Sequence, residues 1–102
     1  MARVAWTARL RPDRIADYER EHAQVWPEVL KVIKDAGVRN YSIYRHEDRV
    51  FGYYECDDPV AAQAAMDIRE RELGWRAAMA ELFMPEVAER GADPMPEIFR
   101  LD

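Results

Sequence analysis

Apolar and polar side chains alternate over residues 3–10, and this period of two predicts a half-buried β-strand. The apolar positions are Val4, Trp6, Ala8 and Leu10. Farther along, apolar residues recur at spacings of three and four from Ile15 to Ile33, which predicts an amphipathic helix. We expect Asp13 to cap that helix at its start and Gly37 to end it.

Pro27 interrupts the helical pattern. A proline inside a helix removes a backbone hydrogen bond and disfavours the helical conformation of the residue before it, so we expect a kink or a second helix that begins at Pro27. Turn residues and apolar patterns predict the later elements. In chain order these are a hairpin of strands 38–45 and 50–56 joined by the loop 46–49, a helix from Pro59 to about Arg71 capped by Asp58, a break at Gly74, a helix from Trp75 to Met84, a loop from Pro85 to Pro96 and a strand over Glu97–Leu101.

The order strand, helix, strand, strand, helix, strand is typical of the α+β ferredoxin-like fold, βαββαβ. The length of 102 residues suits a single domain over residues 1–102.

The hairpin carries apolar side chains at both odd and even positions, although only one face of such a sheet is covered by helices. One set is Tyr41, Ile43, Phe51 and Tyr53, and the other is Val38, Tyr44, Val50 and Tyr54. We therefore expect a second copy to cover the open face, giving a homodimer, a dimeric α+β barrel.

Composition and charge argue against several classes of function. The net charge is −5, and 15 Lys and Arg residues are scattered among 20 Asp and Glu residues, whereas a nucleic-acid binder needs a concentrated basic face. No apolar run has the length of a membrane span, and the N-terminus lacks a signal-peptide pattern. We expect a cytoplasmic protein that binds neither nucleic acid nor membranes. The lone cysteine, Cys56, is expected to be a buried or half-buried residue at a strand end.

His22 is the first candidate for chemistry. It lies four residues after Tyr18 on the apolar stripe of the first helix, so both side chains share one helix face. Histidine exchanges protons near neutral pH, although a histidine at such a position can also be structural. His46 lies in a polar turn, where we expect it to be solvated. Two histidines so far apart form no metal-binding pattern, and we expect no metal.

Other patterns carry less chemistry. The charge-dense segments Glu19–Glu21 and Arg69–Glu72 are expected to be solvated helix faces. The chain has neither a glycine-rich phosphate loop nor a G-x-S-x-G nucleophile elbow, so phosphoryl transfer and serine hydrolysis lack their usual supports. Its many tyrosine and tryptophan rings combine an apolar face with a polar tip, which suits a small polar ligand as well as a core.

Three strings of residues make the chain resemble the L-rhamnose mutarotase family nearly from end to end. They are Tyr18-Glu-Arg-Glu-His22-Ala-Gln-Val-Trp26-Pro27-Glu28, Asn40-Tyr41-Ser42-Ile43-Tyr44 following Gly37, and Glu97-Ile98-Phe99-Arg100-Leu101. The resemblance implies a dimeric α+β barrel that interconverts the α and β anomers of a 6-deoxy hexose such as L-rhamnose, without metal or cofactor. By similarity, His22 corresponds to the proton donor, and Tyr18 and Tyr41 correspond to residues that hold the sugar.

The chain departs from the family pattern at Arg76. The family usually carries two adjacent tryptophans at the sugar, whereas this chain has Trp75-Arg76. Trp75 would stack against the C–H face of the sugar. The Arg76 guanidinium would bind sugar hydroxyls or a carboxylate, or it points to solvent.

Anomer exchange suits so sparse a site. An acid protonates the ring oxygen while a base takes the proton of the anomeric hydroxyl, and the opened ring then closes on its other face. His22 is the candidate acid, and Tyr18, a carboxylate or a bound water is the second group. Two alternatives stay open: the fold also hosts cofactor-free oxygenation and haem breakdown, and the same pocket could bind a small sugar without changing its anomer.

Overall fold

The computed structural model describes all 102 residues. Its strands are β1 (Ala2–Arg9), β2 (Arg39–His46), β3 (Arg49–Cys56) and β4 (Asp93–Pro94). Its helices are α1 (Ile15–Ala23), α2 (Pro27–Asp35), α3 (Pro59–Leu73), α4 (Trp75–Ala80) and α5 (Pro85–Arg90), with a 3₁₀ turn at Pro12–Arg14. The strands form one antiparallel sheet in the order β2-β3-β1-β4. The α+β ferredoxin-like architecture is confirmed.

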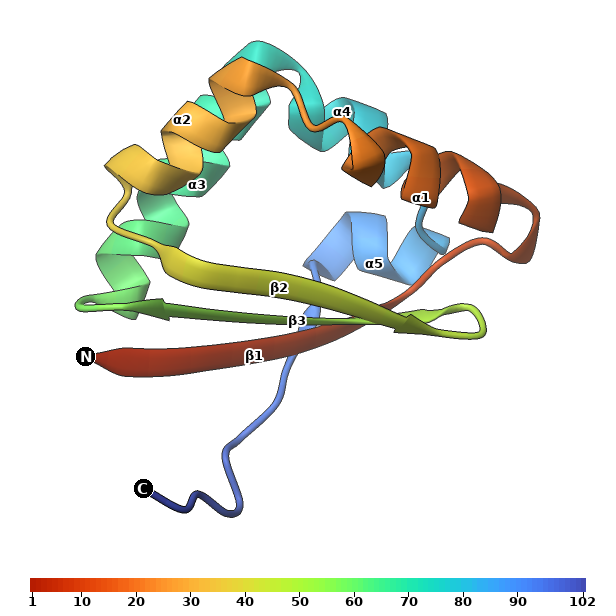
Figure 1. Ribbon diagram of the computed structural model, residues 1–102. Helices are drawn as coiled ribbons and strands as arrows, with labels where there is room; N and C mark the ends of the chain where they lie inside the picture. Colours follow the sequence, from red (N-terminus) through yellow and green to blue (C-terminus); the bar gives the residue numbers. More distant parts are fainter.

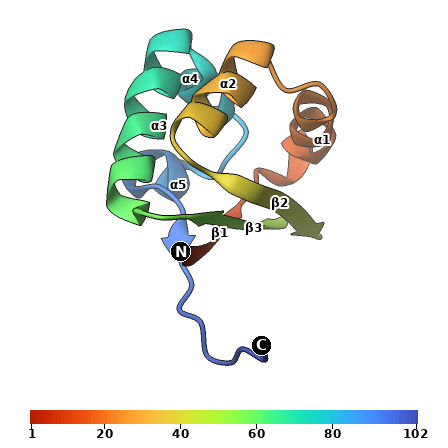
Figure 2. The same cartoon turned by 60° about the vertical axis from the view of Figure 1, so that its left-hand side comes forward.

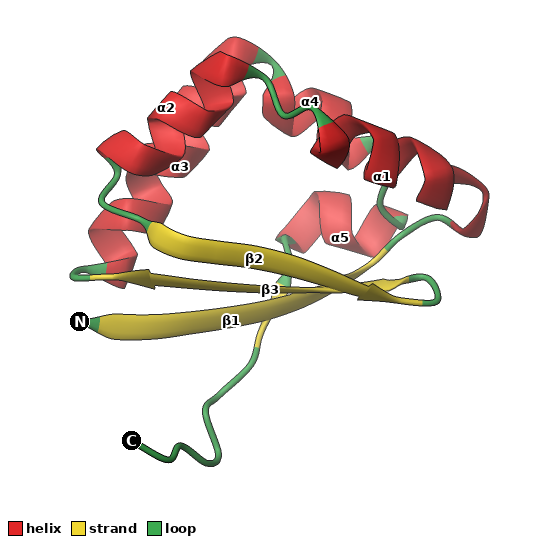
Figure 3. Cartoon of the chain, viewed as in Figure 1, coloured by secondary structure: helices red, strands yellow, loops and turns green.

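Helices and strands form two layers. The helices α1 to α4 lie on one side of the sheet, and the chain after β4 leaves on the other side (Figures 1 and 2). The colouring by secondary structure shows the same separation of a helical layer from the strands (Figure 3). On β3, Val50 and Tyr54 are buried between the layers, whereas Phe51 and Tyr53 of the opposite face are half-buried. No helix is long and apolar enough to cross a membrane.

Local signals set the boundaries of the middle helices. Trp26 is extended and Pro27 is the first residue of α2, so the expected second helix is confirmed. The Asp58 side chain accepts a hydrogen bond from the backbone N–H of Ala61 and caps α3. Gly74 ends α3 in the left-handed conformation, which glycine adopts without strain. The break at Gly74 places Trp75 at the start of a separate helix, α4.

The expected cap at Asp13 is wrong. Pro12 begins a 3₁₀ turn of which Asp13 is the middle residue, and Arg11 occupies the position before it. No side-chain cap bond is present at that turn or at α1. The tight turn at Pro12 therefore takes the place of the helix start that was expected at Asp13.

The hairpin turn is shorter than the expected loop 46–49. His46 pairs with Arg49, so only Glu47 and Asp48 lie between the strands. This register sets Ile43 opposite Gly52 and Tyr44 opposite Phe51. Odd positions of β2 therefore share a face with even positions of β3, and the expected grouping by parity is wrong. The helix-facing set contains Tyr41, Ile43, Val50 and Tyr54, and the open set contains Tyr44, Phe51 and Tyr53.

The predicted strand over Glu97–Leu101 is also wrong. The short strand β4 pairs with Trp6 and Thr7 of β1, and the amide of Met95 still donates to the carbonyl of Ala5 at 2.9 Å. Pro96 has no N–H with which to continue the ladder, so pairing ends there. The chain then runs away from the sheet (Figure 1) and leaves exposed the apolar side chains of Ile98, Phe99 and Leu101.

The segment after Trp75 folds differently from the expected helix and loop. The helix α4 ends at Ala80 instead of Met84, because Phe83 bridges to Leu10 and the amide of Met84 donates to the carbonyl of Arg9. Within the expected loop, Pro85 begins the short helix α5, as proline favours the first helical position.

Candidate functional site

Three aromatic rings from two helices form the centre of the candidate site. Tyr18 and His22, one turn apart on α1, stack with their ring centroids 4.1 Å apart. Trp75, the first residue of α4, meets the His22 ring edge-on at 5.7 Å and is buried. The shared helix face that was expected for Tyr18 and His22 is confirmed, and the packing of α4 adds Trp75 to it.

One nitrogen of His22 is already engaged. Its Nδ1 lies 2.9 Å from the backbone carbonyl oxygen of Tyr18, and because a carbonyl oxygen only accepts, Nδ1 carries the proton and donates. Burial lowers the pKa of His22, although this hydrogen bond acts in the opposite direction. The imidazole is therefore neutral at pH 7, and its Nε2 is free to take up a proton.

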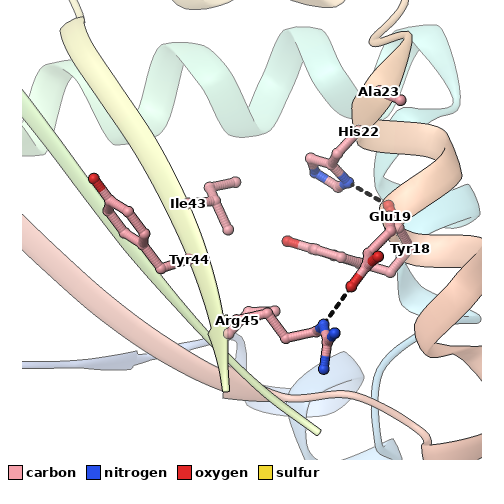
Figure 4. A pocket seen from close by; sticks show the side chains of 8 residues that line it. Tyr18, Glu19, His22, Ala23, Ile43, Tyr44 and Arg45 are labelled. Atoms are coloured by element: carbon pink, nitrogen blue, oxygen red, sulfur yellow. Dashed lines mark hydrogen bonds and ion pairs between the residues drawn. The ribbon is translucent and has the colours of Figure 1, made fainter. Parts of the chain in front are cut away.

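A pocket of about 340 Å³ lies between α1 and β2, beside the Tyr18–His22 stack. Ile43 of β2 points across it toward the two rings, and the hydroxyl of Tyr18 points toward β2 (Figure 4). An ion pair between Glu19 and Arg45 joins the helix to the strand at one side. Glu19 belongs to a segment expected to be solvated; it is exposed but forms part of the pocket wall.

Tyr41 lies on the same face of the sheet, in the neighbouring cluster of core residues. A one-residue bulge in β2 before Ser42 leaves Tyr41 on the helix-facing side, where its ring packs 5.1 Å from that of Tyr54. Burial raises the pKa of Tyr41 to about 12, and a hydrogen bond from Trp6 lowers it in part. Burial and the proximity of Tyr41 also raise the pKa of Tyr18. Both hydroxyls therefore stay protonated at neutral pH.

Trp75 and Arg76 point to different surroundings. Consecutive residues lie about 100° apart around a helix. Trp75 packs edge-on against Trp26 with centroids 5.0 Å apart, whereas the Arg76 guanidinium pairs with Asp67 of α3. The structure thus brings Tyr18, His22 and Trp75 together, places Tyr41 next to them, and directs Arg76 toward α3.

Glu70 is a titratable residue that the sequence prediction missed. It follows Ala62 and Met66 at spacings of four on α3, and both of these are buried. Glu70 is half-buried on the same stripe, so the expectation that all of Arg69–Glu72 is solvated is wrong at this position. Burial raises the pKa of Glu70 to about 7, while the charge of Arg76 acts to lower it. The period of four was the signal that could have revealed it.

The raised pKa of Glu70 predicts a pH-dependent stability. Between its usual value of 4.5 and about 7, the folded protein binds more of this proton than the unfolded chain does. The free energy of unfolding therefore contains a contribution that falls as the pH rises through this range. Glu70→Gln should remove that contribution. Urea titrations of parent and variant between pH 4.5 and pH 7 measure it, and identical slopes against pH would contradict it.

No three His, Cys, Asp or Glu side chains come together as metal ligands. Cys56 is buried, as expected, and unpaired. His46 is exposed at the hairpin turn. The titratable groups that line the pocket are the His22 imidazole, the phenols of Tyr18 and Tyr44, the Glu19 carboxylate and the Arg45 guanidinium.

Comparisons with known proteins agree with the resemblance. A family model described as L-rhamnose mutarotase matches residues 3–101. Among curated proteins, the L-rhamnose mutarotase of Opitutus terrae is 33% identical and that of Phocaeicola vulgatus 31% identical, each with both chains covered in full.

Solved structures share the fold. The crystal structure of an L-rhamnose mutarotase from Formosa agariphila has a TM-score of 0.78 at 24% identity, with both chains covered in full. A dimeric ferredoxin-like protein from an uncultured marine organism has a TM-score of 0.60 at 11% identity, covering 98% of this chain and 95% of its own. Since the family model spans almost every residue, this chain belongs to the L-rhamnose mutarotase family.

Proposed function

We propose that the protein is an aldose anomerase that interconverts the α and β anomers of L-rhamnose or a related 6-deoxy sugar. The observation that carries the proposal is the Tyr18–His22–Trp75 arrangement beside an open pocket in a chain that belongs to this family. It combines a proton-exchanging imidazole with aromatic surface. Ring opening and closure need proton transfer and orientation and no redox step.

His22 is the proposed proton-transfer residue, through its Nε2. The bond from Nδ1 to the Tyr18 carbonyl fixes the ring orientation. Because burial keeps the imidazole neutral, it takes a proton from the sugar when the ring opens and is the proton donor when the ring closes. The same residue thus serves both halves of the exchange, since anomers interconvert through one open-chain form.

The sugar is held by Tyr18, Tyr41 and Trp75 in this proposal. The two hydroxyls remain protonated and serve as hydrogen-bond donors or acceptors to sugar oxygens. An edge or face of Trp75 meets the C–H groups of the sugar. Such positioning accounts for a large share of the rate advantage in a reaction that also proceeds in water.

Anomer exchange on freshly dissolved sugar tests the function. Polarimetry or exchange NMR on L-rhamnose and L-fucose should show faster approach to anomeric equilibrium with the protein than without it. A protein that binds the sugar but leaves the exchange rate at its background value would be a binding module. Absorbance in the Soret region after addition of haem would instead favour a haem-handling enzyme.

Arg76 is proposed to act outside direct sugar contact, since its guanidinium is paired with Asp67. Arg76→Trp should then leave the order of preference among L-rhamnose, L-fucose, L-mannose and a uronic acid unchanged. Exchange rates of parent and variant on the four sugars measure this. A rise in the rate for L-rhamnose relative to the other three would show that Arg76 contacts the sugar.

A homodimer through the open face of the sheet is also proposed. Phe51 and Tyr53 are half-buried there and Tyr44 is exposed, and a small domain gains stability by covering such a patch. We expect the mass of a dimer by light scattering at micromolar concentration. Phe51→Lys should yield a monomer, because a charge in the centre of the contact is left without a partner. A well-folded monomeric parent would contradict the proposal.

The cytoplasmic location of the protein stays a prediction.

A further inference from the structure

The carboxylate of Glu70 has no partner within the protein. It lies one turn after Met66 on α3, and Met66 is buried in the cluster that Tyr41 packs against. Glu70 has no hydrogen bond and no ion pair. Asp67, three residues earlier on α3, accepts hydrogen bonds from Gln63 and Arg76. A half-buried carboxylate without a partner is unfavourable in the free protein. Such a group is therefore available to a bound molecule.

Tyr41 connects Glu70 to the His22 site. The charge of Glu70 acts on the Tyr41 hydroxyl, and Tyr41 in turn acts on Tyr18, whose ring stacks on His22. The packing agrees: Met66, one turn before Glu70, is buried in the cluster against which Tyr41 packs, and Asp67 of α3 pairs with Arg76, the residue after Trp75. Glu70 therefore belongs to the helix that packs beside Tyr41, whereas His22 belongs to α1.

The other candidates for a second proton-transfer group are engaged or mismatched. Glu19 is held by Arg45, and Asp67 is held by Arg76. The hydroxyls of Tyr18 and Tyr41 have raised pKa values, which makes them poor partners for a proton exchange at neutral pH. Two half-buried carboxylates here, Glu21 and Glu70, have no hydrogen bond or ion pair. Glu21 lies about 100° from His22 around α1, off the helix face that carries the Tyr18–His22 stack, which leaves Glu70.

We propose that Glu70 is the second catalytic residue, and that it exchanges a proton with the sugar oxygen that His22 does not serve. This inference rests on the proposed anomer exchange. In ring opening, the Glu70 carboxyl gives its proton to the ring oxygen as the bond between that oxygen and the anomeric carbon breaks. At the same time, Nε2 of His22 takes the proton of the anomeric hydroxyl as the carbonyl forms.

Ring closure returns both protons. The sugar's freed hydroxyl adds to the other face of the carbonyl carbon and gives its proton to the Glu70 carboxylate. The imidazolium of His22 gives its proton to the carbonyl oxygen, which becomes the new anomeric hydroxyl. Both residues end in their starting forms, so the cycle needs no further reactant.

The surroundings of Glu70 suit this exchange. Burial raises the pKa of Glu70 most, Arg76 of α4 lowers it and Asp67 on the same helix raises it. Tyr41 of β2 packs against the cluster that contains Met66, one turn before Glu70. The neighbouring helix α2 contributes no buried charge, since all its charged residues are exposed: Glu28, Lys31, Lys34 and Asp35. With a pKa of about 7, part of the carboxyl population is protonated near neutral pH. The rate should therefore fall as the pH rises above that value.

Glu70→Gln tests the inference, with Glu72→Gln as the matched control because Glu72 is exposed on the same helix. Exchange NMR on L-rhamnose across pH 5 to 9 gives kcat/KM for each protein. We expect Glu70→Gln to lose on the order of 10²-fold in kcat/KM and to lose the fall at high pH, while Glu72→Gln behaves as the parent. A Glu70→Gln variant with the parent's rate and pH profile overturns the role of Glu70.

Two further variants distinguish a catalytic Glu70 from one whose replacement only unfolds or distorts the protein. In Glu70→Ala, added formate should restore part of the rate, because it supplies a carboxyl group to the vacated space. In Arg76→Gln, the fall in rate should move to higher pH, because a charge that lowers the pKa of Glu70 is gone. Failure of both effects overturns the inference. A parent that does not accelerate exchange refutes the anomerase function, whereas an active parent with an unaffected Glu70→Gln refutes Glu70 alone.

Discussion

His22→Asn should retain the fold and lose at least about 10²-fold of the anomer exchange rate, the usual contribution of a positioned acid–base residue. The asparagine amide can replace the donated hydrogen bond to the Tyr18 carbonyl, which His22 makes at 2.9 Å. It cannot exchange a proton near neutral pH, because an amide does not titrate there. The rate on L-rhamnose by exchange NMR measures the loss.

His46→Asn provides the matched control for this substitution. His46 is exposed at the hairpin turn, away from the Tyr18–His22 stack, so the same chemical change there should leave the rate at the parent's value. Melting curves of both variants separate loss of chemistry from loss of folding. If His22→Asn melts as the parent does and keeps its rate, His22 is a structural histidine.

The parts of the fold that the sequence predicted are those that a single residue determines locally. Pro27 begins α2, Asp58 caps α3 and Gly74 ends it, because each residue type restricts its own backbone or binds the adjacent one. The alternation at the start of the chain likewise predicted β1. These signals need no knowledge of the rest of the molecule.

Two of the errors concern choices that depend on distant partners. The faces of the hairpin follow from the pairing of Ile43 with Gly52, and numbering within each strand does not show that pairing. The last strand ended early because Pro96 follows the point where the chain meets β1 at Ala5. Neither the edge of β1 nor its register can be read from the C-terminal residues alone.

The candidate site was predictable only in part for the same reason. The spacing of Tyr18 and His22 placed them together because both lie on one helix. The contact between His22 and Trp75 requires α1 to approach the start of α4, which periodicity does not encode. Glu70 was hidden in a charged run, and its inward position follows from α3 burying Ala62 and Met66 against the sheet side.

Gly52 is the position where a single added methyl group should cost the most stability. It lies on β3 opposite Trp6 of β1, and the Trp6 indole covers it. A Cβ at residue 52 would lie 2.0 Å from Cε2 of Trp6, far inside contact distance. The indole is large and packed against both core clusters, so it cannot swing aside freely. We expect Gly52→Ala to lose about 1–3 kcal/mol of unfolding free energy, the usual cost of overpacking.

The substitution Gly52→Ala should also affect sugar binding, because it displaces the Trp6 indole. Because Trp6 and Tyr41 pack against the same core cluster, a displaced indole should disturb Tyr41, weaken sugar binding and raise KM for L-rhamnose more than it lowers kcat. Urea denaturation of Gly52→Ala, Trp6→Leu and the double variant measures the clash. In the double variant the methyl group enters space that the indole has vacated, so its loss should be smaller than the sum of the single losses. Strictly additive losses would show that residue 52 and Trp6 do not compete for the same space.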